Sequence, residues 1–70
     1  MYKTNSGREF YTFKEKKPVS GEKIIVHTSD DEAIYVKYID VNGIDHFSNI
    51  DFNGSTDKDE IKGWNYWNAL

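Results

Sequence analysis

Two histidines, His27 and His46, are the first side chains in this sequence to consider for catalysis or metal binding. An imidazole needs a carboxylate or further ligands beside it for either role. His27 ends an apolar run, and the hairpin pairing argued below sets His46 opposite Ile39. Nothing in their spacing brings the two rings together, so we expect both histidines to be structural, at a strand end or a sheet edge.

Two Asp-rich stretches, Asp40–Asp45 and Asp51–Glu60, resemble calcium loops in composition. The EF-hand loop places oxygen ligands at positions 1, 3 and 5, glycine at 6 and glutamate at 12. In both stretches the glycine falls at position 4, which fits a tight turn better. We therefore expect no metal and no cofactor.

Nucleophilic chemistry lacks its usual residues. The chain has no cysteine, its serines lie outside any nucleophile-elbow context, and its five glycines occur singly at turn positions. These absences predict that the protein is not an enzyme and has no phosphate-binding glycine loop.

Charge is distributed unevenly along the chain. Residues 1–23 carry six basic and three acidic side chains, whereas residues 24–61 carry two basic and nine acidic ones. An acidic surface disfavours nucleic-acid phosphates and favours a basic partner, although the same pattern is typical of a solvated face. The candidate partner-binding residues are Asp30, Asp31, Glu32, Asp57, Asp59 and Glu60.

The basic N-terminal segment supports an alternative site. Aromatic and cationic side chains alternate there in a way that can stack and neutralise a single nucleic-acid strand. The residues that would do this are Arg8, Tyr11, Lys14, Lys16 and Lys17. Aromatic residues in a small β domain also commonly form its core, and a surface-isolated Tyr11 would exclude a stacking platform.

A β-hairpin over 33–52 is the element that the sequence predicts most directly. Asn42-Gly43 favours a type I′ turn between two extended segments. A two-residue loop then gives a ladder that runs from the pair Val41–Ile44 at the turn to the pair Ala33–Phe52. Within it, Tyr38 lies opposite Phe47 and Val36 opposite Asn49. The ladder also pairs Asp40 with Asp45, a like-charge pair that normally costs stability.

Further elements complete a mainly β fold. Lys23–Thr28 is predicted to pair antiparallel with 33–41, residues 9–13 form a short first strand, and Met1–Gly7 is a flexible end. One or two helical turns are expected over Asp57–Lys62. The tail is predicted to be a last strand that buries at least one tryptophan, with Trp67 and Leu70 over an open edge. The result is a compact antiparallel meander or small barrel-like sheet of four or five strands with at most one short helix.

Length limits the organisation of the protein. Seventy residues without cysteine form a single small domain, 1–70, whose core depends on eleven aromatic side chains. Chains of this size often gain support from a second copy, so a homodimer is one expectation. The sequence shows no signal-peptide or membrane-spanning run, which predicts a cytoplasmic protein that does not enter membranes.

One set of residues resembles a known group. The series runs from Lys17-Pro18 and Gly21 through Ile24-Ile25-Val26, Ala33, Tyr35 and Tyr38 to Phe47, and closes on Gly63-Trp64, Trp67 and Leu70. It resembles small uncharacterised domains of phages, prophages and mobile elements, which open on Leu-Pro-x-x-Gly and close on Thr-His-Trp-x-x-Leu-Pro. This chain lacks the leucine before Pro18, the Thr-His before Trp64 and the final proline. The resemblance implies a β-rich fold, a mobile-element origin and no catalytic residues.

Together these observations predict a non-enzymatic binding protein, encoded by a phage, that binds a host protein and modulates or inhibits it. One such host protein is a component of a bacterial defence system. The chain would then act in the cytoplasm of the host cell. The alternative is a single-stranded nucleic-acid-binding module that uses the basic aromatic segment.

Overall fold

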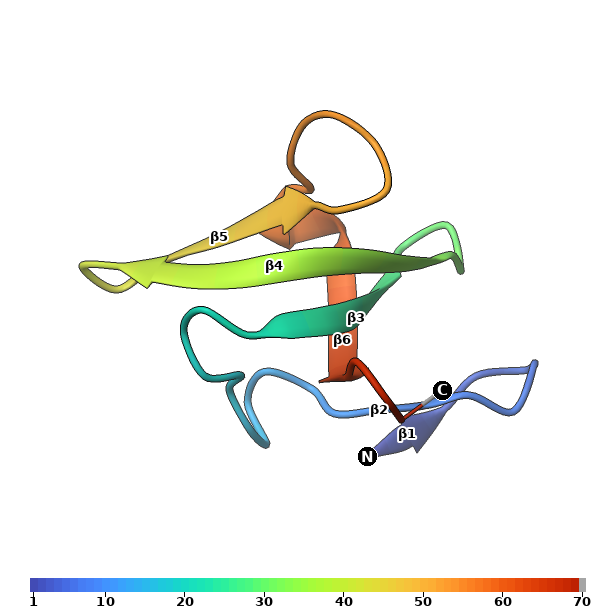
Figure 1. Cartoon of the computed structure of the whole chain (residues 1–70). Helices are drawn as coiled ribbons and strands as arrows, with labels where there is room; N and C mark the ends of the chain where they lie inside the picture. Colours follow the sequence, from blue (N-terminus) through green and yellow to red (C-terminus); the bar gives the residue numbers. More distant parts are fainter. Residues whose placement is uncertain (70) are drawn as a thin grey trace.

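The computed structural model describes residues 1–69 and has two antiparallel sheets with a single 3₁₀ turn (Figure 1). This confirms the predicted mainly β class, with an open sheet rather than a closed barrel. The smaller sheet pairs β1 with β2, and the larger one has the order β5-β4-β3-β6. The elements are β1 (Tyr2–Lys3), β2 (Glu9–Phe10), β3 (Lys23–Thr28), β4 (Ala33–Val41), β5 (Ile44–Asn49), η1 (Lys58–Glu60) and β6 (Ile61–Tyr66).

The β4–β5 hairpin has the predicted turn and register. Asn42 and Gly43 have φ of 52° and 83°, and Tyr38 lies opposite Phe47 in the ladder. The regular ladder ends at the pair Val36–Asn49, and the expected pairing of residues 33–34 with 51–52 is wrong. The chain turns away there because Asn49 N–H donates to the Gly54 carbonyl at 3.0 Å. The predicted pair of Tyr35 with Ile50 keeps one hydrogen bond, from Ile50 N–H to the Tyr35 carbonyl at 3.1 Å.

Strand β6 comes from the end of the chain and lies beside β3. This confirms that the tail forms a strand, while the expected helix shrinks to η1, whose preceding Asp57 makes no side-chain cap. Gly63 allows a close approach, because a Cβ there would lie 2.6 Å from the Tyr11 carbonyl oxygen. Trp64 is fully buried, as predicted. Trp67 packs on Tyr35, and Leu70 lies outside the described residues.

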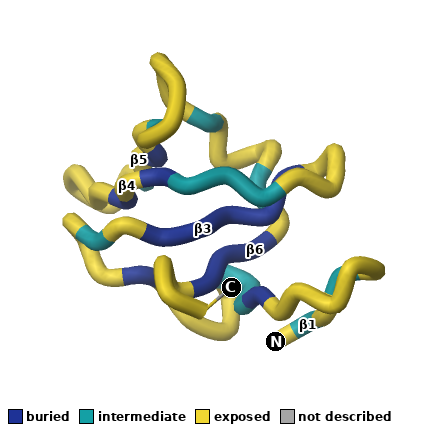
Figure 2. Tube along the Cα trace, turned by 45° about the vertical axis from the view of Figure 1, so that its right-hand side comes forward, coloured by how far each residue is buried: buried dark blue, intermediate teal, exposed yellow. Residues whose placement is uncertain are grey.

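The core cluster takes side chains from all four strands of the larger sheet, β3 to β6, and burial is most continuous along β3 and β6 (Figure 2). Alternating positions send Val26, Val36 and Trp64 to one face of this sheet, where Tyr11 and Phe13 of the N-terminal segment cover them. On the opposite face, Phe10 stacks on the His27 ring at 5.0 Å. Both faces of β3 are therefore covered, as its continuous apolar run predicts.

The N-terminal residues form structure where the sequence suggests a loose end. Tyr2 pairs with Phe10 across the β1–β2 ladder, and Gly7 adopts φ of 87° in the connecting turn. Within residues 1–69, no helix has the length and apolar character needed to cross a bilayer.

Candidate functional site

Two acidic turns that lie far apart in the sequence are neighbours in the structure. Ser29 N–H, in the β3–β4 turn, donates to the Glu60 carbonyl of η1 at 2.7 Å. This contact brings together the six predicted partner-binding residues, which we call the acidic end: Asp30, Asp31, Glu32, Asp57, Asp59 and Glu60. All six are exposed. The candidate site is thus one surface built from two loops.

Two members of the acidic end also shape its first turn. Asp30 accepts a hydrogen bond from the Thr28 hydroxyl at 2.5 Å, and Thr28 N–H donates to the Glu32 carbonyl. Asp31 has φ of 62° and accepts from the His27 ring. Within residues 1–69, the carboxylates of Glu32, Asp57, Asp59 and Glu60 make no such internal bond, which leaves them available to a partner.

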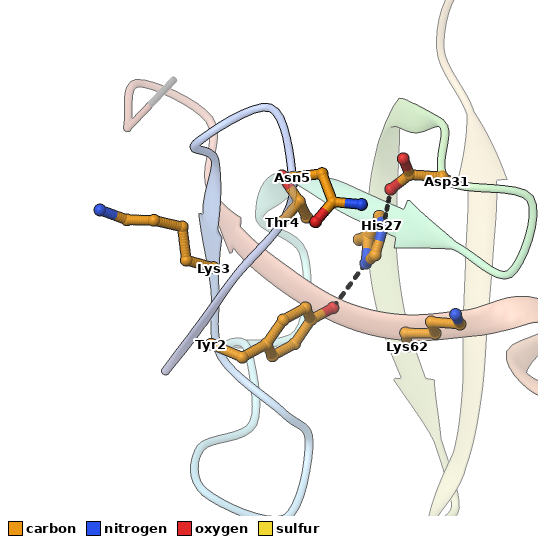
Figure 3. A pocket seen from close by; sticks show the side chains of 7 residues that line it. All are labelled: Tyr2, Lys3, Thr4, Asn5, His27, Asp31 and Lys62. Carbon is orange, nitrogen blue, oxygen red and sulfur yellow. Dashed lines mark hydrogen bonds and ion pairs between the residues drawn. The ribbon is translucent and has the colours of Figure 1, made fainter.

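His27 joins the acidic end to the N-terminal hairpin through a directed hydrogen-bond chain (Figure 3). The Asp31 carboxylate can only accept, so His27 Nε2–H donates to it at 2.7 Å. The unprotonated Nδ1 then accepts from the Tyr2 hydroxyl, also at 2.7 Å. This order of hydroxyl, imidazole and carboxylate is also that of a nucleophile, its base and an orienting acid.

A pocket of about 500 Å³ opens beside this chain and is lined by Tyr2, Lys3, Thr4, Asn5, His27, Asp31 and Lys62. Burial and the Asp31 charge both raise the pKa of the Tyr2 phenol. The phenol therefore stays protonated near neutral pH and can donate its hydrogen bond to His27. These two hydrogen bonds tie β1 to the β3–β4 turn through His27, which lies near the end of β3.

His46 lies apart from this tie, exposed and opposite Ile39 as predicted. In the described part of the chain, no three histidine, aspartate or glutamate side chains are grouped as metal ligands. We assign no metal site.

The Asp40–Asp45 pair exists as predicted, and the structure shows how its repulsion is relieved. The side chain of Asp45 is 2% exposed and accepts from the Tyr38 hydroxyl and Lys58 Nζ, each at 2.5 Å. Asp40 turns instead to the Gly43 N–H at 2.9 Å. Burial alone would raise the pKa of Asp45, but the hydrogen bonds from Lys58 and Tyr38 outweigh it and hold this pKa below its ordinary value.

The basic N-terminal segment keeps only part of its predicted platform. Tyr11 is half-buried against Trp64, and Lys17 Nζ lies 3.7 Å from an Asp45 oxygen. Tyr11 is nevertheless not isolated, because the Tyr66 ring meets it edge-on and Lys16 Nζ lies 5.2 and 5.0 Å from the two ring centroids. Arg8 and Lys14 are exposed. A small aromatic-cationic cluster remains.

Sequence reasoning missed three residues that matter here. Tyr2 bonds a histidine 25 residues away, and Lys58 pairs with an aspartate 13 residues away. No local sequence pattern predicts either contact. Tyr66 could have been found, because a strand over the tail places it on the same face as Trp64.

Comparisons of the chain with protein-family models, with curated proteins and with solved structures found no match.

Replacing Asp45 with Asn tests the buried carboxylate. Because its pKa is lowered in the folded state, it stabilises the fold above the ordinary Asp pKa of about 3.9 and loses that effect as pH falls further. We expect Asp45→Asn to lower the free energy of unfolding at pH 7 by about 1–3 kcal/mol. The difference from the unaltered chain should shrink below about pH 4.

Urea unfolding measured from pH 7 to pH 3 gives both quantities. The matched control is Asp59→Asn, which removes an exposed carboxylate and should leave stability nearly unchanged. A difference between Asp45→Asn and the unaltered chain that stays constant across this range would contradict the assignment.

Proposed function

We propose that this chain is a non-enzymatic binding protein whose acidic end docks on a basic surface of a partner protein. The observation that carries the proposal is the Ser29–Glu60 hydrogen bond, which unites two acidic turns into one surface. Charge of one sign on a compact patch speeds association with an oppositely charged partner and disfavours other partners.

The geometry of the remaining polar groups agrees with a binding role. Lys58, the one cation in η1, is engaged by Asp45 and does not neutralise the acidic end. The Tyr2–His27–Asp31 chain holds the first acidic turn in a fixed conformation. A surface that is already ordered loses less conformational entropy when it binds.

The resemblance to phage and prophage domains extends this proposal to the partner. A phage-encoded protein with an acidic surface would bind a host protein in the host cytoplasm and modulate or inhibit it. A defence-system component that handles nucleic acid fits well, because carboxylates on a folded surface can compete with phosphates for its basic groove.

A homodimer is compatible with this role. Val41, Ile44 and Ile39 are exposed on one face of the β4–β5 hairpin, where a second copy could cover them. The tip that carries Val41 and Ile44 is at the opposite end of β4 from the β3–β4 turn, so such a contact would leave the acidic end free.

Partner capture from host lysate tests the proposed function. The tagged chain should retain a specific protein at low salt, and the doubly neutralised variant Glu32→Gln, Asp59→Asn should retain several-fold less, because opposite charges across the interface are lost. The matched control, Glu9→Gln with Glu22→Gln, removes two carboxylates outside the acidic end and should retain as much as the original chain. Equal retention by all three chains, or no specific protein at low and moderate salt, would contradict the proposal.

The second candidate function is single-stranded nucleic-acid binding. The cluster of Tyr11, Tyr66 and Lys16 favours it, since Tyr66 is exposed and can stack a base while a lysine reaches the phosphate. Arg8 and Lys14 would add cations along the same segment.

Fluorescence anisotropy with a labelled mixed-sequence single strand decides this second candidate. If it holds, binding at low salt should weaken steeply as salt rises, because each phosphate contact releases counterions. Tyr66→Ala should weaken binding by about 1–3 kcal/mol through lost stacking. The control His46→Ala changes an exposed ring on the β4–β5 hairpin and should have no effect. Absence of binding at low salt eliminates this function.

A further inference from the structure

A loop of residues 50–54 projects from the larger sheet after β5, and we call it the Phe52 loop (Figure 1). Its base is fixed on both sides. Asn49 N–H donates to the Gly54 carbonyl at 3.0 Å, Ser48 and Ser55 form a β-bridge, and Thr56 N–H donates to the Phe47 carbonyl at 2.9 Å. The Thr56 hydroxyl also donates to the Asn49 side-chain oxygen at 2.7 Å. The loop therefore extends into solvent from an anchored base.

The Phe52 loop exposes apolar side chains to solvent. Phe52 is 54% exposed, the most exposed aromatic residue in the described chain, and Ile50 is 37% exposed. The other phenylalanines are needed by the fold, since Phe10 and Phe47 are buried and Phe13 packs against the core. An exposed aromatic residue on an ordered loop is typical of a binding anchor.

The charges around the Phe52 loop match those of the acidic end. Residues 51–60 contain four acidic side chains and a single cation, Lys58, which is paired with Asp45. Three of the four acids belong to the acidic end, and Thr56, hydrogen-bonded beside β5, leads directly into them. Interfaces commonly combine one buried apolar anchor with a polar rim that excludes water.

Resting on the proposed function, we propose that Phe52 is the apolar anchor of the acidic end. The partner then presents an apolar pocket ringed by lysine or arginine. Charge complementarity selects this partner: the apolar ring fills the pocket, while Asp51 and the acidic end face its cationic rim. The exposed aliphatic side chains at the tip of the β4–β5 hairpin lie on a face whose strand positions carry Lys37 and His46 and no carboxylate, so they lack this complementarity.

Site-specific photocrosslinking tests the anchor directly. The residue p-benzoylphenylalanine, which has the shape of an extended phenylalanine, replaces Phe52 in one chain. It replaces Val19 or Ile44, which are 65% and 63% exposed, in two control chains. After irradiation in host lysate, we expect an adduct with a host protein from position 52 alone, lost when Glu32→Gln and Asp59→Asn are added. Mass spectrometry of that adduct should locate the crosslink in a partner segment with apolar residues flanked by lysine or arginine.

A second variant separates this inference from the proposed function. Phe52→Ala should keep its melting midpoint, because the side chain is largely exposed, yet lose at least about tenfold in retention of the captured partner. If retention depends on Glu32 and Asp59 but not on Phe52, the anchor is wrong while the acidic-end function stands. An adduct that joins position 52 to a second copy of the chain, or equal host-protein adducts from all three positions, also overturns the anchor. Failure of the unaltered chain to capture any protein overturns both.

Discussion

The packing of Trp64 is the interaction on which the rest of this small fold depends. Its side chain is fully buried, and its strand position pairs with Val26 of β3. On the other side of β6, Trp64 and Tyr11 exchange backbone hydrogen bonds of 2.8 and 2.9 Å. The indole N–H donates to the Lys16 carbonyl at 2.9 Å. One residue thus joins the larger sheet, the N-terminal segment and the core, which matters in a domain with little core to spare.

The position of β6 also determines how the surface is displayed. Because β6 lies next to β3, the turn η1 that precedes it arrives beside the β3–β4 turn, where Glu60 accepts from Ser29. The connection from β5 to η1 must then cross the end of the sheet, and the Phe52 loop projects from this crossing (Figure 1). The acidic end and the exposed phenylalanine are therefore both consequences of placing the last strand beside the third.

The sequence predicted the parts of this fold that local chemistry encodes. Asn42-Gly43 specified a turn, the turn specified the register up to Asn49, and the apolar run of Lys23–Thr28 specified a strand covered on both faces. The hairpin was predicted too long because its end is set by Gly54, outside the strand. The acidic residues were identified from composition, but their adjacency, the Tyr2–His27 bond and the Lys58–Asp45 pair arise only when β6 and β1 are in place. Such contacts join residues that have no common local pattern.

Truncation of the chain after Lys62 is the most direct test of this account. It removes Trp64 and most of β6 but leaves the residues of all the other strands in the chain. A control chain that ends at Trp67 retains the whole of β6. Circular dichroism during thermal unfolding measures the outcome. The account predicts that the chain ending at Lys62 loses the native spectrum and its cooperative transition, whereas the control keeps both. A chain ending at Lys62 with a native spectrum and an unchanged melting midpoint would contradict it.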